Sequence, residues 1–214
     1  MDLADKIKEA SIKLFFDRGI KAVSMDDVAK SVGISKRTLY ETFASKDALL
    51  VSCFDLLYSE RLRKLDEALR DSSKSFIETM LASVYSAMSF LQTVNPVFFE
   101  DLNRLNCANV RESMNQSMDV YRKKMQGLIE DGKRDGYLRK EVDSEFISYI
   151  ILGNDRRDLP SFASLGRWSL PYMLRHLVAI FLRGMATPKG VEQIDALLAR
   201  MTEADKQKNT KIEI

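Results

Sequence analysis

Residues 24–46 read Ser-Met-Asp-Asp-Val-Ala-Lys-Ser-Val-Gly-Ile-Ser-Lys-Arg-Thr-Leu-Tyr-Glu-Thr-Phe-Ala-Ser-Lys, and they predict two short helices joined by a tight turn. Ser24 is a favourable N-cap residue, and Asp27, three positions later, completes a capping box. Gly33 stands where the first helix ends and the chain needs a left-handed residue. Ser35 can then cap the second helix.

The second helix extends to about Phe43 and has one apolar face. Leu39 and Phe43 are four positions apart, so both side chains face the interior. Two helices and a glycine turn of this kind form a helix-turn-helix, whose second helix enters the major groove of DNA. The polar side chains of this helix lie on the opposite arc and its flanks: Lys36, Arg37, Thr38, Tyr40 and Glu41.

At these residues the sequence resembles the DNA-binding domain of the TetR family of transcriptional regulators. The resemblance covers residues 5–52 and fixes the turn, the second helix and the start of the next helix in one register. It departs from the family at Glu41, where an aromatic or other non-acidic residue is common. Because an acid repels phosphate, Glu41 either points at a cytosine amino group or lies away from the DNA backbone. The residues that carry the resemblance are Asp27-Val28-Ala29, Val32-Gly33-Ile34-Ser35-Lys36, Thr38-Leu39-Tyr40, Phe43 and Ser45-Lys46-Asp47-Ala48-Leu49-Leu50.

Several polar residues of this stretch are candidates for contacts with DNA. An arginine can donate two hydrogen bonds to guanine, and a tyrosine hydroxyl or a lysine suits a phosphate. The alternative is a solvated charged face, which is what a lysine–arginine pair usually forms. The resemblance favours the interface and adds neighbouring positions, so the predicted DNA-binding residues are Ser24, Met25, Ser35, Lys36, Arg37, Thr38, Tyr40, Thr42 and Lys46.

The charge of the chain permits DNA binding without requiring it. In 214 residues the net charge is only +2, with the 45% apolar and 30% charged content of a soluble globular protein. Between residues 30 and 46, however, the chain has only one acid, Glu41, and four bases: Lys30, Lys36, Arg37 and Lys46. The positive field is therefore local.

The sequence argues against several other classes of protein. No apolar run reaches the roughly 18 residues of a membrane span, and the start lacks the order of a signal peptide. Cys53 and Cys107 are too few for a disulfide framework, so a reducing cytoplasm fits. No zinc spacing, glycine-rich phosphate loop or nucleophile motif occurs, and His176 is the only histidine. We therefore expect neither an enzyme, nor a metal, nor a cofactor.

The rest of the chain keeps a helical pattern, which predicts an all-α protein of about nine or ten helices. We expect a helix-turn-helix DNA-binding domain over residues 1–47, a helical ligand-binding and dimerisation domain over 48–205, and a tail over 206–214. Residues 153–166 are polar and predict a loop. The expected helices outside the quoted stretch span residues 3–17, 45–70, 75–93, 97–107, 109–134, 145–152, 171–185 and 191–201.

Methionine and aromatic residues recur along the predicted C-terminal helices. Methionine adapts to ligands of varied shape, so these residues could line a pocket, although such a stripe is more often plain core. The family resemblance implies a small-molecule site in these helices. The apolar candidates indicate a hydrophobic or amphipathic effector, and the predicted ligand-binding residues are Met80, Met88, Met114, Met118, Tyr121, Met125, Phe146 and Tyr149.

Two predicted helices, 145–152 and 171–185, are apolar nearly all round. Such a helix must be buried on both sides, either within its own bundle or against a second copy of the chain. The resemblance implies a dimer interface on the last two long helices. A two-fold symmetric dimer would also read two half-sites of a palindromic operator.

These features together predict a cytoplasmic, homodimeric repressor that binds operator DNA and is released by a small molecule. A ligand would shift the helix over residues 45–70, which carries the DNA-binding head, and so change the spacing of the two recognition helices. Two alternatives stay open. The signal could be a protein partner, or the helix-turn-helix could have lost DNA binding, as Glu41 and the balanced charge of the head would allow.

Overall fold

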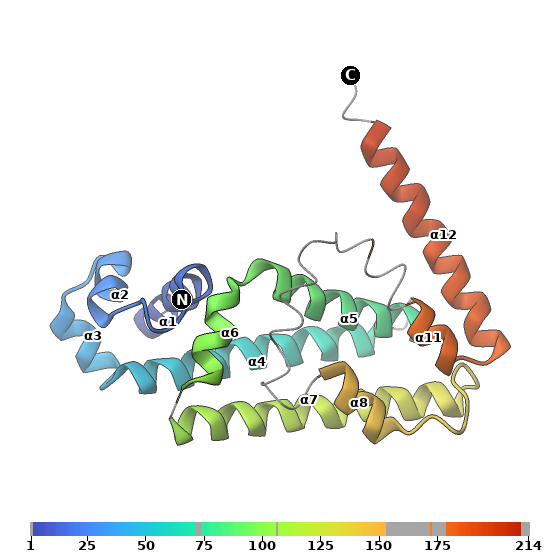
Figure 1. Cartoon of the computed structure of the whole chain (residues 1–214), viewed down its shortest axis with the longest axis horizontal. Helices are drawn as coiled ribbons and strands as arrows, with labels where there is room; N and C mark the ends of the chain where they lie inside the picture. Colours follow the sequence, from blue (N-terminus) through green and yellow to red (C-terminus); the bar gives the residue numbers. More distant parts are fainter. Residues whose placement is uncertain (1, 72–73, 106, 153–171, 173–178, 211–214) are drawn as a thin grey trace.

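The computed structural model is helical almost throughout the residues that it describes (Figure 1). The predicted loop at 153–166 lies outside these residues, and so do residues 171 and 173–178 of the predicted helix at 171–185, including His176. The described residues are 2–71, 74–105, 107–152, 172 and 179–210, with the backbone alone at 84–85, 87–92, 151–152, 179 and 201–210.

The named helices account for nearly all of this structure. Apart from one isolated antiparallel bridge between Leu138 and Ala186, the described ranges contain no β-structure. The predicted all-α class is confirmed. The helices are α1 (Leu3–Arg18), α2 (Met25–Val32), α3 (Lys36–Thr42), α4 (Lys46–Arg70), α5 (Phe76–Thr93), α6 (Pro96–Asn103), α7 (Ala108–Arg134), α8 (Ser144–Leu152), α11 (Ala179–Met185) and α12 (Pro188–Thr210).

The helix-turn-helix forms for the local reasons that its sequence indicates. At the start of α2, the Ser24 hydroxyl accepts a hydrogen bond from the Asp27 amide at 3.2 Å, and the Asp27 carboxylate accepts one from the Ser24 amide at 2.8 Å. Gly33 ends α2 with φ 75° and ψ 32°, a left-handed conformation that glycine adopts without strain. The Ser35 hydroxyl caps α3 by accepting from the Thr38 amide at 3.0 Å. The predicted capping box, turn and second cap are therefore confirmed.

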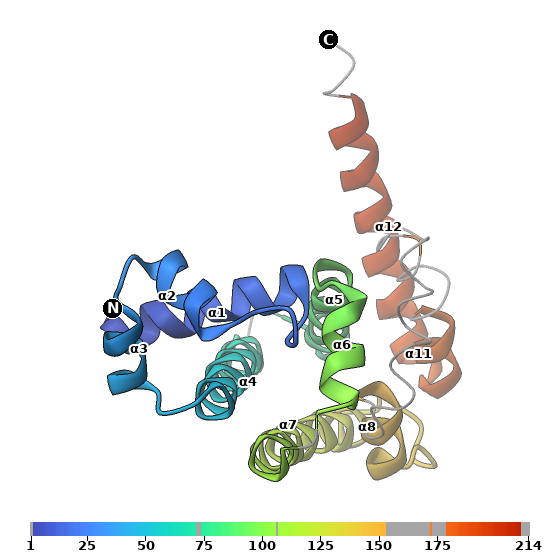
Figure 2. The ribbon, with the colours of Figure 1, turned by 60° about the vertical axis from the view of Figure 1, so that its left-hand side comes forward.

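The head, which we define as α1 to α3 with the first turns of α4, lies at one end of an elongated molecule (Figure 1). The rest of α4 and the later helices other than α6 form the bundle, in which α4 packs against α7 and α5. α6 lies between the bundle and the head (Figure 2). α12 begins at the far end, and its C-terminal half leaves the bundle (Figures 1 and 2). α4 thus belongs to both the head and the bundle.

Two hydrophobic cores hold these helices together. The bundle core gathers residues of α4, α5, α7, α11 and α12 around buried side chains such as Ile77 and Ile129. The head core contains Leu39 of α3, and it also takes in Phe98 of α6 and Val110 of α7. The head therefore packs on later parts of the chain, across the domain boundary expected after residue 47.

Two helices have ends that differ from the prediction. Pro188 is the first residue of α12, where the missing N–H of proline costs no hydrogen bond, so this helix begins before residue 191. Its backbone stays helical to Thr210, and residues 206–210 therefore continue α12 rather than form a tail. α6 is shorter than predicted and ends at Asn103.

Both cysteines are free thiols, as the sequence predicts. Cys53 is buried in the head core, and burial raises the pKa of its thiol to about 12. A thiol with this pKa stays protonated and unreactive near neutral pH. Cys107 is only partly buried.

Among the helices that are described, none combines the length and the apolar character needed to cross a lipid bilayer.

Candidate nucleic-acid interface

Helix α3 presents its polar face at the surface of the head. Leu39 and Phe43 are buried in the head core and fix the rotation of the helix. On the opposite arc, the side chain of Arg37 is 88% exposed and Tyr40 is 43% exposed. A helix held by packing presents such groups in one orientation, which contact with base edges requires.

Both bases at the start of α3 are paired with acids of the head. Lys36 Nζ lies 2.9 Å from Asp26 Oδ1 of α2, and Arg37 Nε donates to Glu41 Oε1 at 2.8 Å. The hydrogen bond to Asp26 raises the pKa of the Lys36 ammonium. Water screens these exposed pairs, so each contributes little to the stability of the fold. The pairing places Glu41 beside Arg37 on the exposed face.

Other predicted DNA contacts already take part in bonds within the head. The Ser24 and Ser35 hydroxyls cap α2 and α3, and the Thr42 hydroxyl donates to the Thr38 carbonyl at 3.0 Å. A hydroxyl has one donor and two acceptor sites, so each of these hydroxyls keeps at least one acceptor site for a donor on DNA, such as a base amino group. Met25 is only 7% exposed because it packs into the head core, and its contact with DNA stays a prediction.

Lys46 is partly buried and forms two hydrogen bonds within the head. Its ammonium donates to the Ile20 carbonyl at 2.6 Å and to the Val23 carbonyl at 2.5 Å. Burial lowers the pKa of this ammonium. Lys46 thus ties the first turn of α4 to the loop between α1 and α2. An ammonium has three N–H donors, so the phosphate contact stays a prediction. The carbonyls lie 26 and 23 residues earlier in the chain, beyond the reach of a local sequence pattern.

Replacing Lys46 with methionine is expected to lower the unfolding free energy by roughly 1–3 kcal/mol, because two carbonyls lose their donor. Urea unfolding of the parent and the variant measures this change. Lys36→Ala removes a nearby exposed lysine and should change stability by less than about 0.5 kcal/mol. If the Lys46→Met variant were as stable as the parent and its DNA binding depended less on salt, Lys46 would act as a phosphate contact and not as a tie within the head.

A joint between α6 and the end of α1 connects the bundle to the head (Figure 2). The Asp101 carboxylate, which is almost fully buried, accepts a hydrogen bond from the Lys21 amide at 2.7 Å. Asn95 donates its backbone amide to the Phe16 carbonyl at 2.9 Å and its side-chain amide to the Asp17 carbonyl at 3.0 Å. These bonds satisfy carbonyls that the end of a helix leaves free. We call this contact the α1–α6 joint.

Gly19 makes the close approach in the α1–α6 joint possible. Its φ of 85° and ψ of 164° suit glycine alone, and a Cβ atom there would lie 2.8 Å from Val97 Cγ1 and 2.9 Å from Asp101 Oδ2. The rings of Phe16 and Phe98 also meet edge to face, with centroids 5.1 Å apart. No local sequence pattern indicates this joint, because some 80 residues separate its two halves.

The predicted ligand-binding residues do not come together at one place. Met80, Tyr121 and Met125 are buried in the bundle core, whereas Met114 belongs to the head core. Met118, on the same helix as Met114, is half-buried. Burial of this kind is what core packing produces, so none of these positions is by itself a sign of a ligand site.

Phe146 and Tyr149 are exposed on α8, and their part in a ligand pocket stays a prediction. Phe146 is 59% exposed, while Ile147 and Ser148 on the other side of the helix pack inward. Hydrophobic periodicity indicated that these positions are apolar but not which neighbour would cover them. The side chain of Met88 lies outside the described ones.

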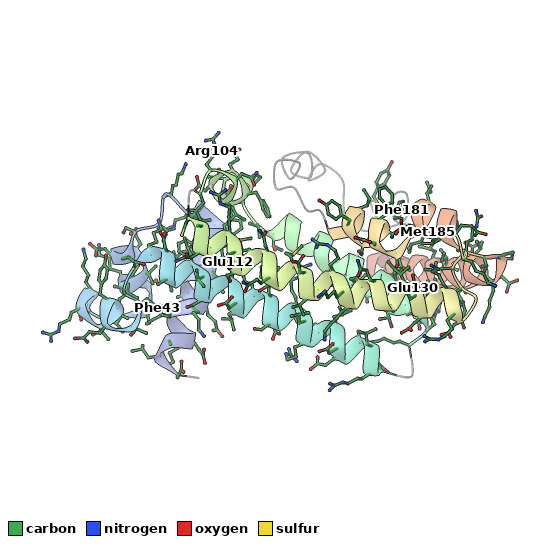
Figure 3. All side chains as sticks on the ribbon, turned by 90° about the horizontal axis from the view of Figure 1, so that it is seen from below. Phe43, Arg104, Glu112, Glu130, Phe181 and Met185 are labelled. Carbon is green, nitrogen blue, oxygen red and sulfur yellow. The ribbon has the colours of Figure 1, made fainter. Side chains whose placement is uncertain are left out.

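α8 and α11 carry exposed apolar side chains in the half of the bundle far from the head (Figure 3). On α8, Phe146, Tyr149 and Ile150 recur at helical spacing and form one exposed face. On α11, Ile180 is 64% exposed and Phe181 is also exposed. A patch of this kind is typical of a surface that another protein covers. Both helices belong to the segments predicted to dimerise.

Comparison with known proteins identifies the family. Residues 7–53 match the model of "Bacterial regulatory proteins, tetR family". The chain is also 30% identical over 157 residues to YhgD of Bacillus subtilis (strain 168), an uncharacterized HTH-type transcriptional regulator, with 71% of this chain and 80% of YhgD covered. This chain belongs to the TetR family. It is a DNA-binding transcriptional regulator, and the family predicted from the helix-turn-helix is confirmed.

Further relatives extend the likeness over most of this TetR-family chain. The HTH-type transcriptional repressor KstR2 of Rhodococcus jostii (strain RHA1) is 21% identical over 186 residues, covering 86% of this chain and 91% of KstR2. The transcriptional regulator FadR from Bacillus subtilis, solved in complex with stearoyl-CoA, superposes with a TM-score of 0.68 at 16% identity, covering 85% of this chain and 98% of FadR. At this identity the structural likeness shows the fold: an N-terminal helix-turn-helix followed by a helical domain.

Proposed function

We propose that this chain is a cytoplasmic, homodimeric repressor that binds a palindromic operator through α3 and is released by a small molecule. The observation that carries the proposal is the exposure of Arg37 and Tyr40 on a helix whose rotation Leu39 fixes. On such a face, arginine can bind guanine and the tyrosine hydroxyl can bind phosphate. The polar side chains that we propose as DNA contacts are Ser24, Ser35, Lys36, Arg37, Thr38, Tyr40, Thr42 and Lys46.

The exposed apolar faces of α8 and α11 support the dimer. A second copy would bury both faces, as the hydrophobic effect favours. Two-fold symmetry would also present two α3 helices to DNA, each only seven residues long. The operator would then contain two half-sites separated by one or more turns of the double helix.

The effector that we propose is apolar or amphipathic, and residues 48–205 would bind it. Methionine and aliphatic side chains form the bundle core, and methionine adapts to ligands of different shape. FadR of Bacillus subtilis, which shares the fold, was solved with stearoyl-CoA. An acyl-CoA is therefore the first class of compound to test.

The α1–α6 joint and Lys46 support a route from the bundle to the head. Lys46 binds the loop between α1 and α2 to α4, and α6 caps the end of α1. A ligand that favours another position of α4 or α6 would therefore move the head as one body. The two α3 helices of the dimer would then no longer match the operator spacing. Only a ligand with different affinities for the two positions has this effect.

Selection of bound duplexes from a random DNA pool at physiological salt tests the DNA-binding part of this proposal. We expect a palindrome to be enriched. Fluorescence anisotropy on the enriched duplex then measures whether stearoyl-CoA releases the protein from the DNA. Free CoA is the control, because it has the polar part of stearoyl-CoA without the acyl chain. A folded dimer that enriches no sequence would overturn the proposal, whereas a palindrome that no apolar compound releases would indicate a protein partner as the signal.

A further inference from the structure

Glu41 is the one acidic side chain in α3, and the proposed DNA-binding role does not use it. It lies four positions after Arg37, so both side chains occupy the same exposed face of the helix. Arg37 Nε donates to Glu41 Oε1 at 2.8 Å. An acid on a DNA-binding face repels phosphate, and its presence beside the most exposed base of the helix therefore needs a reason.

The atoms that form the pair suggest this reason. A guanidinium group is planar and has its Nε at one end and two terminal amino groups at the other. The bond to Glu41 engages Nε, so the terminal amino groups stay available for a ligand. These two groups can donate side by side to the O6 and N7 atoms of guanine. A carboxylate that holds Nε therefore orients the plane of the group without competing for its base-reading end.

We infer that Glu41 is a specificity-determining residue that holds Arg37 in the orientation required for guanine. This inference rests on the proposed function, since it assumes that α3 enters the major groove. Arginine has many rotamers, and ordering such a side chain on binding lowers affinity by about 2- to 12-fold. Glu41 provides this order before DNA arrives. Its negative charge also weakens binding to unrelated DNA, where phosphate attraction dominates.

The Lys36–Asp26 pair is a matched comparison for the same face of the head. It joins one base and one acid at 2.9 Å, and its side chains are exposed to a degree similar to that of Glu41. Asp26→Ala and Glu41→Ala each remove one carboxylate near α3. A general effect of charge would therefore be the same in both variants, whereas an effect on the orientation of Arg37 would appear only at position 41.

The test measures operator affinity with guanine or adenine at each position of one half-site, by anisotropy at physiological salt. Arg37→Ala first identifies the base pair that Arg37 reads, where the parent should prefer guanine by roughly 5- to 150-fold. Glu41→Ala is expected to reduce this preference at the same base pair by about 2- to 12-fold. Asp26→Ala is expected to leave the preference unchanged. Both variants should bind unrelated DNA more tightly than the parent does.

Glu41→Gln separates orientation from charge. Its amide oxygen still accepts a hydrogen bond from Nε, so we expect a preference between those of the parent and Glu41→Ala. A full guanine preference in Glu41→Ala would overturn the inference. Loss at a base pair other than that of Arg37 would also overturn it, because Glu41 would then contact a base directly. If Arg37→Ala changed no base preference, the proposed role of α3 would fail, and this inference with it.

Discussion

Gly19→Ala is expected to lower the unfolding free energy by roughly 3 kcal/mol or more, and to weaken operator binding by the folded protein. The backbone at Gly19, with φ 85° and ψ 164°, is one that other residues adopt only under strain. The added Cβ would also lie 2.8 Å from Val97 Cγ1 and 2.9 Å from Asp101 Oδ2. To relieve this contact, the Val97 and Asp101 side chains or α6 itself must shift, which disturbs the hydrogen bond from the Lys21 amide to Asp101. Urea unfolding and operator binding measure the two effects.

Gly136→Ala is the control for the backbone strain alone. Gly136 also has a positive φ, of 77°, but nothing lies within 4 Å of the position that its Cβ would take. It lies just after α7, far from the head (Figure 1). We expect this variant to lose about 1–2 kcal/mol and to keep its operator affinity. If both variants lost the same stability, the close contact of residue 19 with Val97 and Asp101 would add nothing to the backbone strain, and the steric argument for the α1–α6 joint would be wrong.

Arg37→Ala is expected to lower operator affinity by at least about 30-fold and to leave the fold intact. Each arginine–guanine contact provides discrimination worth roughly 5-fold or more, and a dimer makes the contact twice. The Arg37 side chain is 88% exposed, and an exposed pair such as Arg37–Glu41 contributes little to stability. The measurements are anisotropy on the selected operator and thermal unfolding of both proteins.

Arg63→Ala is the matched control for Arg37→Ala. Arg63 is an exposed arginine on α4 that also pairs with glutamates on its own helix, Glu60 and Glu67. Its removal changes the charge of the chain by the same amount but away from α3. If the two variants lost operator affinity equally, the loss would reflect overall charge, and Arg37 would have no base contact.

Local sequence patterns were sufficient to predict the helix-turn-helix. The capping box at Ser24, the left-handed Gly33 and the buried Leu39 each depend on neighbours within four positions, and all three are present in the structure. The exposed face of α3 follows directly from the burial of the opposite face. The pairing of Arg37 with Glu41 also has a local signal, since opposite charges four positions apart on a helix attract.

Features that depend on distant contacts were beyond the same reasoning. Lys46 is basic and close to α3, but its bonds to the carbonyls of Ile20 and Val23 depend on how the start of α4 packs on the loop between α1 and α2. Similarly, nothing near Asp101 in the sequence indicates that its carboxylate binds the Lys21 amide. Apolar periodicity has the same limit. It correctly indicated that α8 is hydrophobic, but whether an apolar side chain is buried depends on the neighbouring surface, which the sequence of a single helix does not contain.

The most direct test of the central claim, that α3 lies in the major groove, is cleavage of the DNA from a probe fixed beside this helix. Ala44 is exposed, lies two residues after α3 and is not a predicted contact, so Ala44→Cys can carry an iron chelate. Cys107→Ser removes the one accessible native thiol, while Cys53 is buried with a pKa of about 12 and should not react. Lys123→Cys, on the exposed surface of α7, is the control.

We predict that the chelate at residue 44 cleaves the selected operator within both half-sites, symmetrically about its centre, and that the chelate at residue 123 does not. The symmetry follows from the dimer, and the position follows from the entry of α3 into each half-site. Scattered cleavage, or the same pattern from both probes, would contradict the central claim.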